Sequence, residues 1–92
     1  MSIREQVKAT LAEFAAAVPG RSVEIRVPPY GAVQAVSGGD HRRGTPRAQV
    51  ECDAQTWLGL VSGEITWEQA LASGRLHASG ERSDLSEWLP LT

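Results

Sequence analysis

The sequence predicts an α+β fold, in which helices pack on one face of a four- to five-stranded, mostly antiparallel sheet. Two observations lead to this class. Apolar residues at helical spacing open the chain, and the later patterns follow the order three strands, two helices, strand, helix. The 92 residues, 41% apolar and 22% charged, are expected to form a single domain over residues 1–92, close to the size at which one core is only just sufficient.

The first predicted helix covers residues 3–18. Ser2 and Glu5 form a capping box before it, and Pro19 ends it. The opposite side of the helix carries polar residues such as Thr10, which are expected to face water. The apolar stripe that faces the core is formed by Ile3, Val7, Leu11, Phe14 and Val18.

Four segments alternate apolar and polar residues, as strands with one buried face do. Pro28 and Pro29 end the first strand, and Tyr30 and Gly31 turn the chain into the second. The second strand is rich in small residues, which would let another element approach closely. The strands are predicted over residues 23–27, 32–36, 48–52 and 75–79.

Two short helices between the third and fourth strands have their own start and stop residues. Asp53 is the expected N-cap of the first, and Gly63 is expected to end it in the left-handed conformation. Thr66 and Gln69 form a capping box for the second helix, and Gly74 ends it. These signals predict architecture rather than chemistry.

A closing helical turn is predicted near the end of the chain. Ser83 is expected to cap it, and its apolar side is expected to contain Leu85, Trp88 and Leu89.

Charge and composition argue against several classes of protein. The net charge is −2 and the eight Arg and one Lys are scattered, which does not favour nucleic acid as a partner. The apolar runs are short and the first ten residues are charged and amphipathic, so we expect a cytoplasmic protein without stable membrane insertion. The only cysteine, Cys52, has inward strand parity and is expected to be a buried, inert thiol.

A long loop is predicted over residues 37–47, where turn-forming residues are dense. Loops of this length tend to be either functional or disordered, so this loop is the first place to look for a site. Arg42 or Arg43 could bind a carboxylate or phosphate head group through a guanidinium fork. The alternative is a solvated loop, or an Arg that pairs with Glu51 or Asp84.

The remaining polar residues do not form a recognisable catalytic or metal-binding pattern. His41 and His77 lack nearby ligands at metal-binding spacing, so neither a metal nor another cofactor is expected. The sequence contains no acid–base pair or activated nucleophile that we can name, so we do not expect an enzyme.

The stretches VECD, LVSG, WEQALASG and RLHASGE follow one another before an LPL ending. In this order they resemble the C-terminal half of sterol carrier protein 2 domains. The N-terminal helix and the first two strands also have the order of that family, so the resemblance covers nearly the whole chain. It is strongest to the small stand-alone bacterial members, for which HRRGTP and TW are also typical stretches.

The resemblance implies a five-stranded sheet and an apolar tunnel between sheet and helices that binds sterols, fatty acids or acyl-CoA. This sequence departs from it between Val36 and Ala48, where the predicted loop replaces an expected strand. An empty cavity of roughly 300 Å³ would cost about 7 kcal/mol, so such a tunnel must be filled by ligand, water or side chains. The candidate tunnel residues are Val27, Val33, Val50, Trp57, Leu60, Val61, Leu71, Leu76, Leu85 and Trp88, with Arg42 and Arg43 for the head group.

Three functions stay open at this point. The first is a non-enzymatic lipid carrier, with a hydrophobic small molecule as its partner. The second is a protein-interaction or dimerisation module, such as a homodimer, whose tryptophans fill the core in place of a ligand. The third is an accessory domain of a thiol-dependent isomerase, because similar domains are appended to such enzymes.

Overall fold

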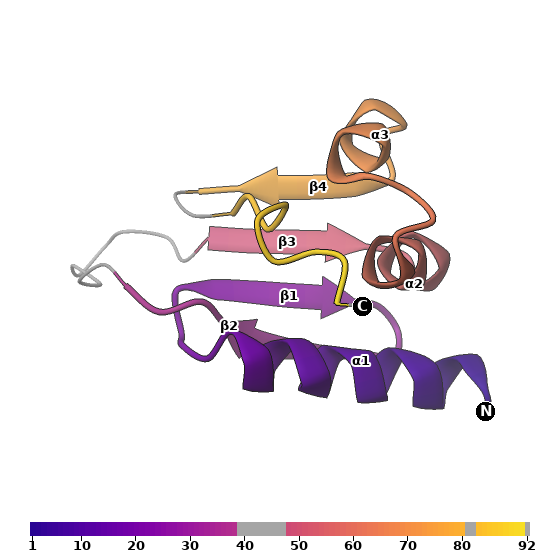
Figure 1. Ribbon diagram of the computed structural model, residues 1–92, viewed down its shortest axis with the longest axis horizontal. Helices are drawn as coiled ribbons and strands as arrows, with labels where there is room; N and C mark the ends of the chain where they lie inside the picture. Colours follow the sequence, from indigo (N-terminus) through magenta and orange to yellow (C-terminus); the bar gives the residue numbers. More distant parts are fainter. Residues whose placement is uncertain (39–47, 81–82, 92) are drawn as a thin grey trace.

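The computed structural model of the chain describes residues 1–38, 48–80 and 83–91 (Figure 1). A helix, three strands, two helices and a fourth strand follow one another, the grouped order that is typical of an α+β fold. In chain order they are α1 (Ile3–Ala17), β1 (Val23–Val27), β2 (Gly31–Ala35), β3 (Ala48–Cys52), α2 (Ala54–Ser62), α3 (Trp67–Ala72) and β4 (Leu76–Ser79).

The described strands form one four-stranded sheet with the order β2-β1-β3-β4. The two outer pairings, β1 with β2 and β3 with β4, are antiparallel, whereas β1 and β3 are parallel. The prediction of a mostly antiparallel sheet of four to five strands is therefore confirmed. The fifth strand that the family resemblance implies is not found among the described residues.

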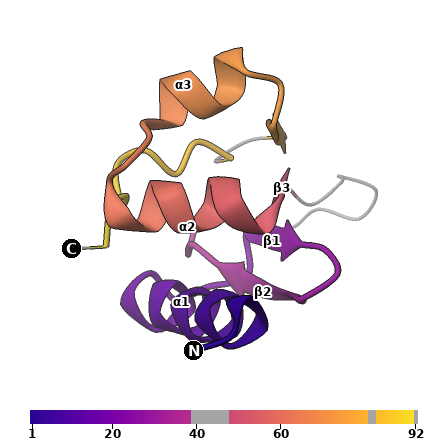
Figure 2. The same ribbon diagram turned by 90° about the vertical axis from the view of Figure 1, so that its right-hand side faces the viewer.

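One face of the sheet is covered by the three helices (Figure 2). Val23, Ile25 and Val27 of β1 are fully buried on this face. The other face is polar. There the Nε atom of Arg26 lies 3.7 Å from Oε1 of Glu24 on the same strand and 4.0 Å from Oε1 of Glu51 on β3. Such exposed ion pairs contribute little to stability. Helices packed on one face of the sheet are thus confirmed.

The predicted caps are present at all three helices. Ser2 and Thr66 each begin a helix with a complete capping box. Asp53 caps α2 by accepting a hydrogen bond of 2.8 Å from the Thr56 N–H. Gly63 ends α2 with φ 87°, the left-handed conformation that glycine adopts without steric cost. The strand and helix bounds differ from the predicted ones by only one or two residues.

The predicted closing helix is a single turn within residues 83–91, which we call the C-terminal segment. Asp84 supports this turn, because its carboxylate accepts a hydrogen bond of 2.9 Å from the Ser86 N–H. The prediction of Ser83 as the cap is wrong, since its hydroxyl donates to the Gly80 carbonyl at 3.0 Å instead. The segment crosses the helix-covered face of the sheet (Figure 1) and fully buries Leu85 there.

The core lies between the sheet and the helices. Its largest fully buried side chain is Trp57, whose ring packs edge-on against Phe14 with 5.8 Å between the ring centroids. Edge-to-face contacts of this kind suit the charge distribution of aromatic rings. Among the described helices, none combines the length and the apolar character that crossing a bilayer requires.

Candidate functional site

Most of the residues that were predicted to line a ligand tunnel belong to the core between the sheet and the helices. Trp57 reaches into this core from α2 and has no exposed surface. The candidates that are buried in it are Val27, Val50, Trp57, Leu60, Val61, Leu76 and Leu85.

The remaining candidates lie elsewhere. Val33 and Trp88 are partly buried and pack against the edge of the core. Leu71 lies on the surface of α3 with 43% of its area exposed. Arg42 and Arg43, the head-group candidates, lie outside the described residues.

Trp57 is held in the core by a polar contact that the sequence did not reveal. Its indole N–H donates a hydrogen bond of 2.9 Å to the Thr10 hydroxyl on α1. We expected Thr10 to face water, but it lies where α1 meets α2 and is only partly exposed. A buried indole N–H usually needs such an acceptor, so this hydrogen bond selects the inward orientation of the ring.

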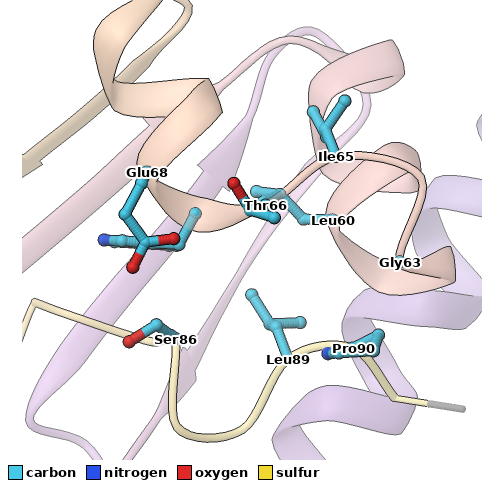
Figure 3. A pocket seen from close by; sticks show the side chains of 9 residues that line it. Leu60, Gly63, Ile65, Thr66, Glu68, Ser86, Leu89 and Pro90 are labelled. Atoms are coloured by element: carbon cyan, nitrogen blue, oxygen red, sulfur yellow. The ribbon is translucent and has the colours of Figure 1, made fainter.

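A pocket of about 410 Å³ opens between α2, the beginning of α3 and the C-terminal segment (Figure 3). We call it the α3 pocket. Its volume falls within the range of small-molecule sites. Its lining combines apolar side chains with two hydroxyls and one carboxylate, and consists of Leu60, Gly63, Ile65, Thr66, Trp67, Glu68, Ser86, Leu89 and Pro90.

One wall of the α3 pocket depends on a glycine inside α2. A Cβ atom on Gly59 would lie 2.9 Å from Cγ1 of Ile65, which is closer than the two atoms can pack. The missing side chain lets the chain fold back after α2, and the Ile65 N–H then donates to the Gly59 carbonyl at 3.3 Å. Ile65 is thereby placed beside Leu60 at the pocket.

The opposite wall is the C-terminal segment. The Leu91 N–H donates a hydrogen bond of 3.0 Å to the carbonyl of Val61, which ties the end of the chain to α2. Pro90 packs against Gly63. If Gly63 carried a Cβ atom, that atom would lie 3.4 Å from Cγ of Pro90. Leu89 therefore faces the pocket from the side opposite α3 (Figure 3).

Glu68 is the only charged residue among the described residues that line the α3 pocket. In Figure 3 its carboxylate is directed toward the side of the pocket that Ser86 lines. The Thr66 hydroxyl already accepts a hydrogen bond of 3.1 Å from the Gln69 N–H as part of the capping box. The pocket can therefore hold an apolar chain and offer one anionic acceptor to its polar end.

Two further pockets are more open. One of about 560 Å³ lies between α1 and α2, where Leu58 and Val61 line it together with polar residues such as Gln6 and Thr10. Another of about 270 Å³ contains Cys52 and His77.

The sequence offered no candidate catalytic group, and Cys52 does not supply one. Burial, with a smaller contribution from the neighbouring carboxylates of Asp53 and Glu51, raises the pKa of its thiol to about 12. A thiol with so high a pKa is a poor nucleophile at neutral pH. The described residues also contain no group of three or more His, Cys, Asp or Glu that could hold a metal ion.

Of the candidates named from the sequence, Leu60 alone lines the α3 pocket. Several lining residues were missed. Ile65 lies in the connection between two helices, and Leu89 and Pro90 lie at the end of the predicted closing turn, where no pocket was expected. One signal could have pointed to this site. Trp67 directly follows the Thr66 cap, and so large an aromatic side chain at the start of a six-residue helix needs a neighbouring segment to bury it.

Comparison with known protein families gave one match. The sequence model of a family described as bacterial SCP ortholog matches residues 1–91, almost the whole chain. No curated protein matches the chain.

Proposed function

This chain belongs to the family of bacterial SCP orthologs, stand-alone proteins that resemble sterol carrier proteins, and we propose that it is a non-enzymatic lipid-binding protein. In this proposal the α3 pocket holds the apolar chain of one ligand. The family match and the lining of the pocket support the proposal independently.

The α3 pocket carries the proposal. Its volume of about 410 Å³ suits a single hydrocarbon chain better than a large polar molecule. Its accessible apolar surface comes chiefly from Ile65, Leu89 and Pro90, because Leu60 and Trp67 are almost fully buried behind them. Burying an apolar chain against them would release about 25 cal/mol for each Å² of apolar surface removed from water.

A site between the sheet and the helices is less favourable for the ligand. A lipid there would have to displace Trp57, which is fully buried and hydrogen-bonded to Thr10. Removing a buried Trp side chain from a core typically costs about 3–5 kcal/mol. The α3 pocket requires no such displacement, so we place the ligand at the edge of the core rather than inside it.

A binding role rather than catalysis fits the chemistry of the α3 pocket. Glu68 is its single titratable side chain among the described residues, and it has no second acid or base beside it there. An activated nucleophile usually has a base within hydrogen-bond reach, and the described lining contains no such pair.

The proposal can be tested by filling the pocket. A pyrene-labelled dodecyl probe is titrated into the wild-type protein and into Ser86→Trp, which adds an indole to the pocket without removing a core residue. We expect saturable binding to the wild-type protein and at least tenfold weaker binding to Ser86→Trp. The matched control is Ser62→Trp, which alters the pocket between α1 and α2 and should bind the probe like the wild-type protein.

An absence of saturable binding to the wild-type protein contradicts the proposed function. Equal binding by Ser86→Trp and the wild-type protein would instead locate the ligand outside the α3 pocket. Far-UV circular dichroism of both variants shows whether they keep the fold.

A second candidate is an interaction module that forms a homodimer. Two observations favour it: Trp57 fills the predicted tunnel, and Leu71 is exposed on α3. Sedimentation velocity of the wild-type protein and of Leu71→Ser distinguishes this function. A dimer that Leu71→Ser dissociates supports the interaction module, whereas a monomer at all concentrations leaves lipid binding as the function.

A further inference from the structure

The charge in the α3 pocket limits which lipids it can accept. Its described lining contains one carboxylate, that of Glu68, and neither Lys nor Arg. In the pocket beside Cys52, by contrast, Arg75 is among the lining residues. A carboxylate or phosphate head group bound in the α3 pocket would thus meet a like charge without a compensating cation from the described lining.

The two backbone N–H groups of the capping box at the beginning of α3 do not offset this repulsion. The Thr66 N–H is already bonded to the Gln69 side chain at 2.9 Å, and the Gln69 N–H is bonded to the Thr66 hydroxyl at 3.1 Å. These backbone donors are therefore engaged within the capping box and not available to an anionic head group.

A head group that donates a hydrogen bond meets the opposite situation. A hydroxyl or an ammonium group can donate to the Glu68 carboxylate, and hydrogen bonds to ionised acceptors are stronger than those between neutral groups. Ser86 lies on the side toward which that carboxylate is directed (Figure 3), and its hydroxyl can accept or donate a second hydrogen bond.

We propose that the ligand of the α3 pocket is a single-chain lipid whose head group donates hydrogen bonds, a hydroxyl or an ammonium group, and not a fatty acid or an acyl-CoA. This inference rests on the proposed function, since it names the class of lipid for the same pocket. Glu68 is the residue that selects the head group.

The test uses three probes with the same hydrocarbon chain: dodecanol, dodecylamine and laurate. Each competes with the pyrene-labelled dodecyl probe for the wild-type protein at neutral pH and low ionic strength. Glu68 is exposed, so solvent screens part of its charge, and a like charge about 4 Å away is expected to weaken binding by roughly fivefold or more. We therefore expect laurate to bind at least about fivefold more weakly than both dodecanol and dodecylamine.

The variant Glu68→Lys should reverse the order, so that laurate binds more tightly than dodecylamine. Glu68→Gln should bring laurate close to dodecanol, because it removes the charge and keeps the size. The matched control is Glu13→Lys, which makes the same change of net charge on the exposed side of α1 and should retain the wild-type order.

The outcomes separate this inference from the proposed function. Laurate that binds the wild-type protein as tightly as dodecanol, with no effect of Glu68→Lys, overturns the inference and leaves lipid binding intact. If none of the three probes competes and the pyrene probe itself does not bind, the proposed function has failed and the inference fails with it.

Discussion

The indole N–H of Trp57 donates a hydrogen bond of 2.9 Å to the hydroxyl of Thr10, 47 positions earlier in the chain. This contact joins α2 to α1 and orients the largest fully buried side chain of the protein. Trp57 then occupies the space between sheet and helices where a lipid tunnel was predicted.

Thr10→Val should destabilise the protein by about 1–2 kcal/mol, because it keeps the shape of the side chain and leaves the indole N–H without its acceptor. Urea unfolding followed by Trp fluorescence measures this change. Thr10→Ser retains the hydroxyl and should cost less than Thr10→Val. Equal stability of Thr10→Val and the wild-type protein would show that water satisfies the indole as well as Thr10 does.

Asp53→Ala should reduce stability by about 1 kcal/mol at neutral pH through loss of the α2 cap. The Thr56 side chain and backbone N–H both lower the pKa of Asp53 from 3.8, while partial burial opposes them. The Thr56 N–H donates to the Asp53 carboxylate at 2.8 Å. The Thr56 hydroxyl lies near the carboxylate without forming a hydrogen bond to any described residue, so we assign the lowered pKa chiefly to the N–H.

Because this pKa is lowered by folding, the charge of Asp53 stabilises the protein above the unfolded pKa, and the effect is lost as the pH falls through the folded pKa. The difference in unfolding free energy between wild type and Asp53→Ala should therefore narrow below about pH 4. Asp53→Asn, which keeps an acceptor without the charge, should lie between them at neutral pH. If the difference in unfolding free energy stays constant down to about pH 2, the charge of Asp53 does not contribute to stability.

Gly63→Ala should cost about 1–2 kcal/mol, because φ is 87° at the end of α2 and a Cβ atom is disfavoured in the left-handed conformation. The added methyl group would also approach Pro90 on the facing wall of the α3 pocket. Chemical denaturation measures the loss. Gly63→Asn is the matched variant, since Asn tolerates this conformation better, and it should be the more stable of the two.

Cys52 should react very slowly in the folded protein. Its pKa of about 12 leaves roughly one part in ten thousand as thiolate at about pH 8, compared with about a quarter for an unperturbed thiol. Labelling with a disulfide reagent should thus be at least about 100-fold slower in native buffer than in denaturant. Comparable rates in the two conditions would mean that β3 opens readily and that the thiol is not held in the core.

The elements of the fold could be predicted because their signals are local. The capping boxes at Ser2 and Thr66 each involve residues three positions apart, and the alternation along β1 reports which side chains face the core. Both depend only on backbone geometry within one element. The closing turn was predicted less well, because Ser83 and Asp84 are both residue types that cap turns, and here Asp84 accepts the hydrogen bond.

The candidate site could not be predicted in the same way. Helical spacing places Trp57 and Leu60 on one side of α2, but it does not say which of them fills the core and which also reaches a pocket. That division depends on Thr10 in a distant helix and on the fit of Ile65 against Gly59. Contacts between elements of this kind leave little trace in one sequence.

The most direct test of the account is a titration of the isotopically labelled wild-type protein with dodecanol, followed by NMR. We predict saturable shifts centred on the Trp67 indole, Ile65 and Leu89, around the α3 pocket, with small shifts at Ile25 and Val50 in the sheet. No saturable shifts, or shifts concentrated at Ile25, Val50 and Trp57, would contradict the account: the first outcome removes lipid binding, and the second returns the ligand to a tunnel beneath the helices.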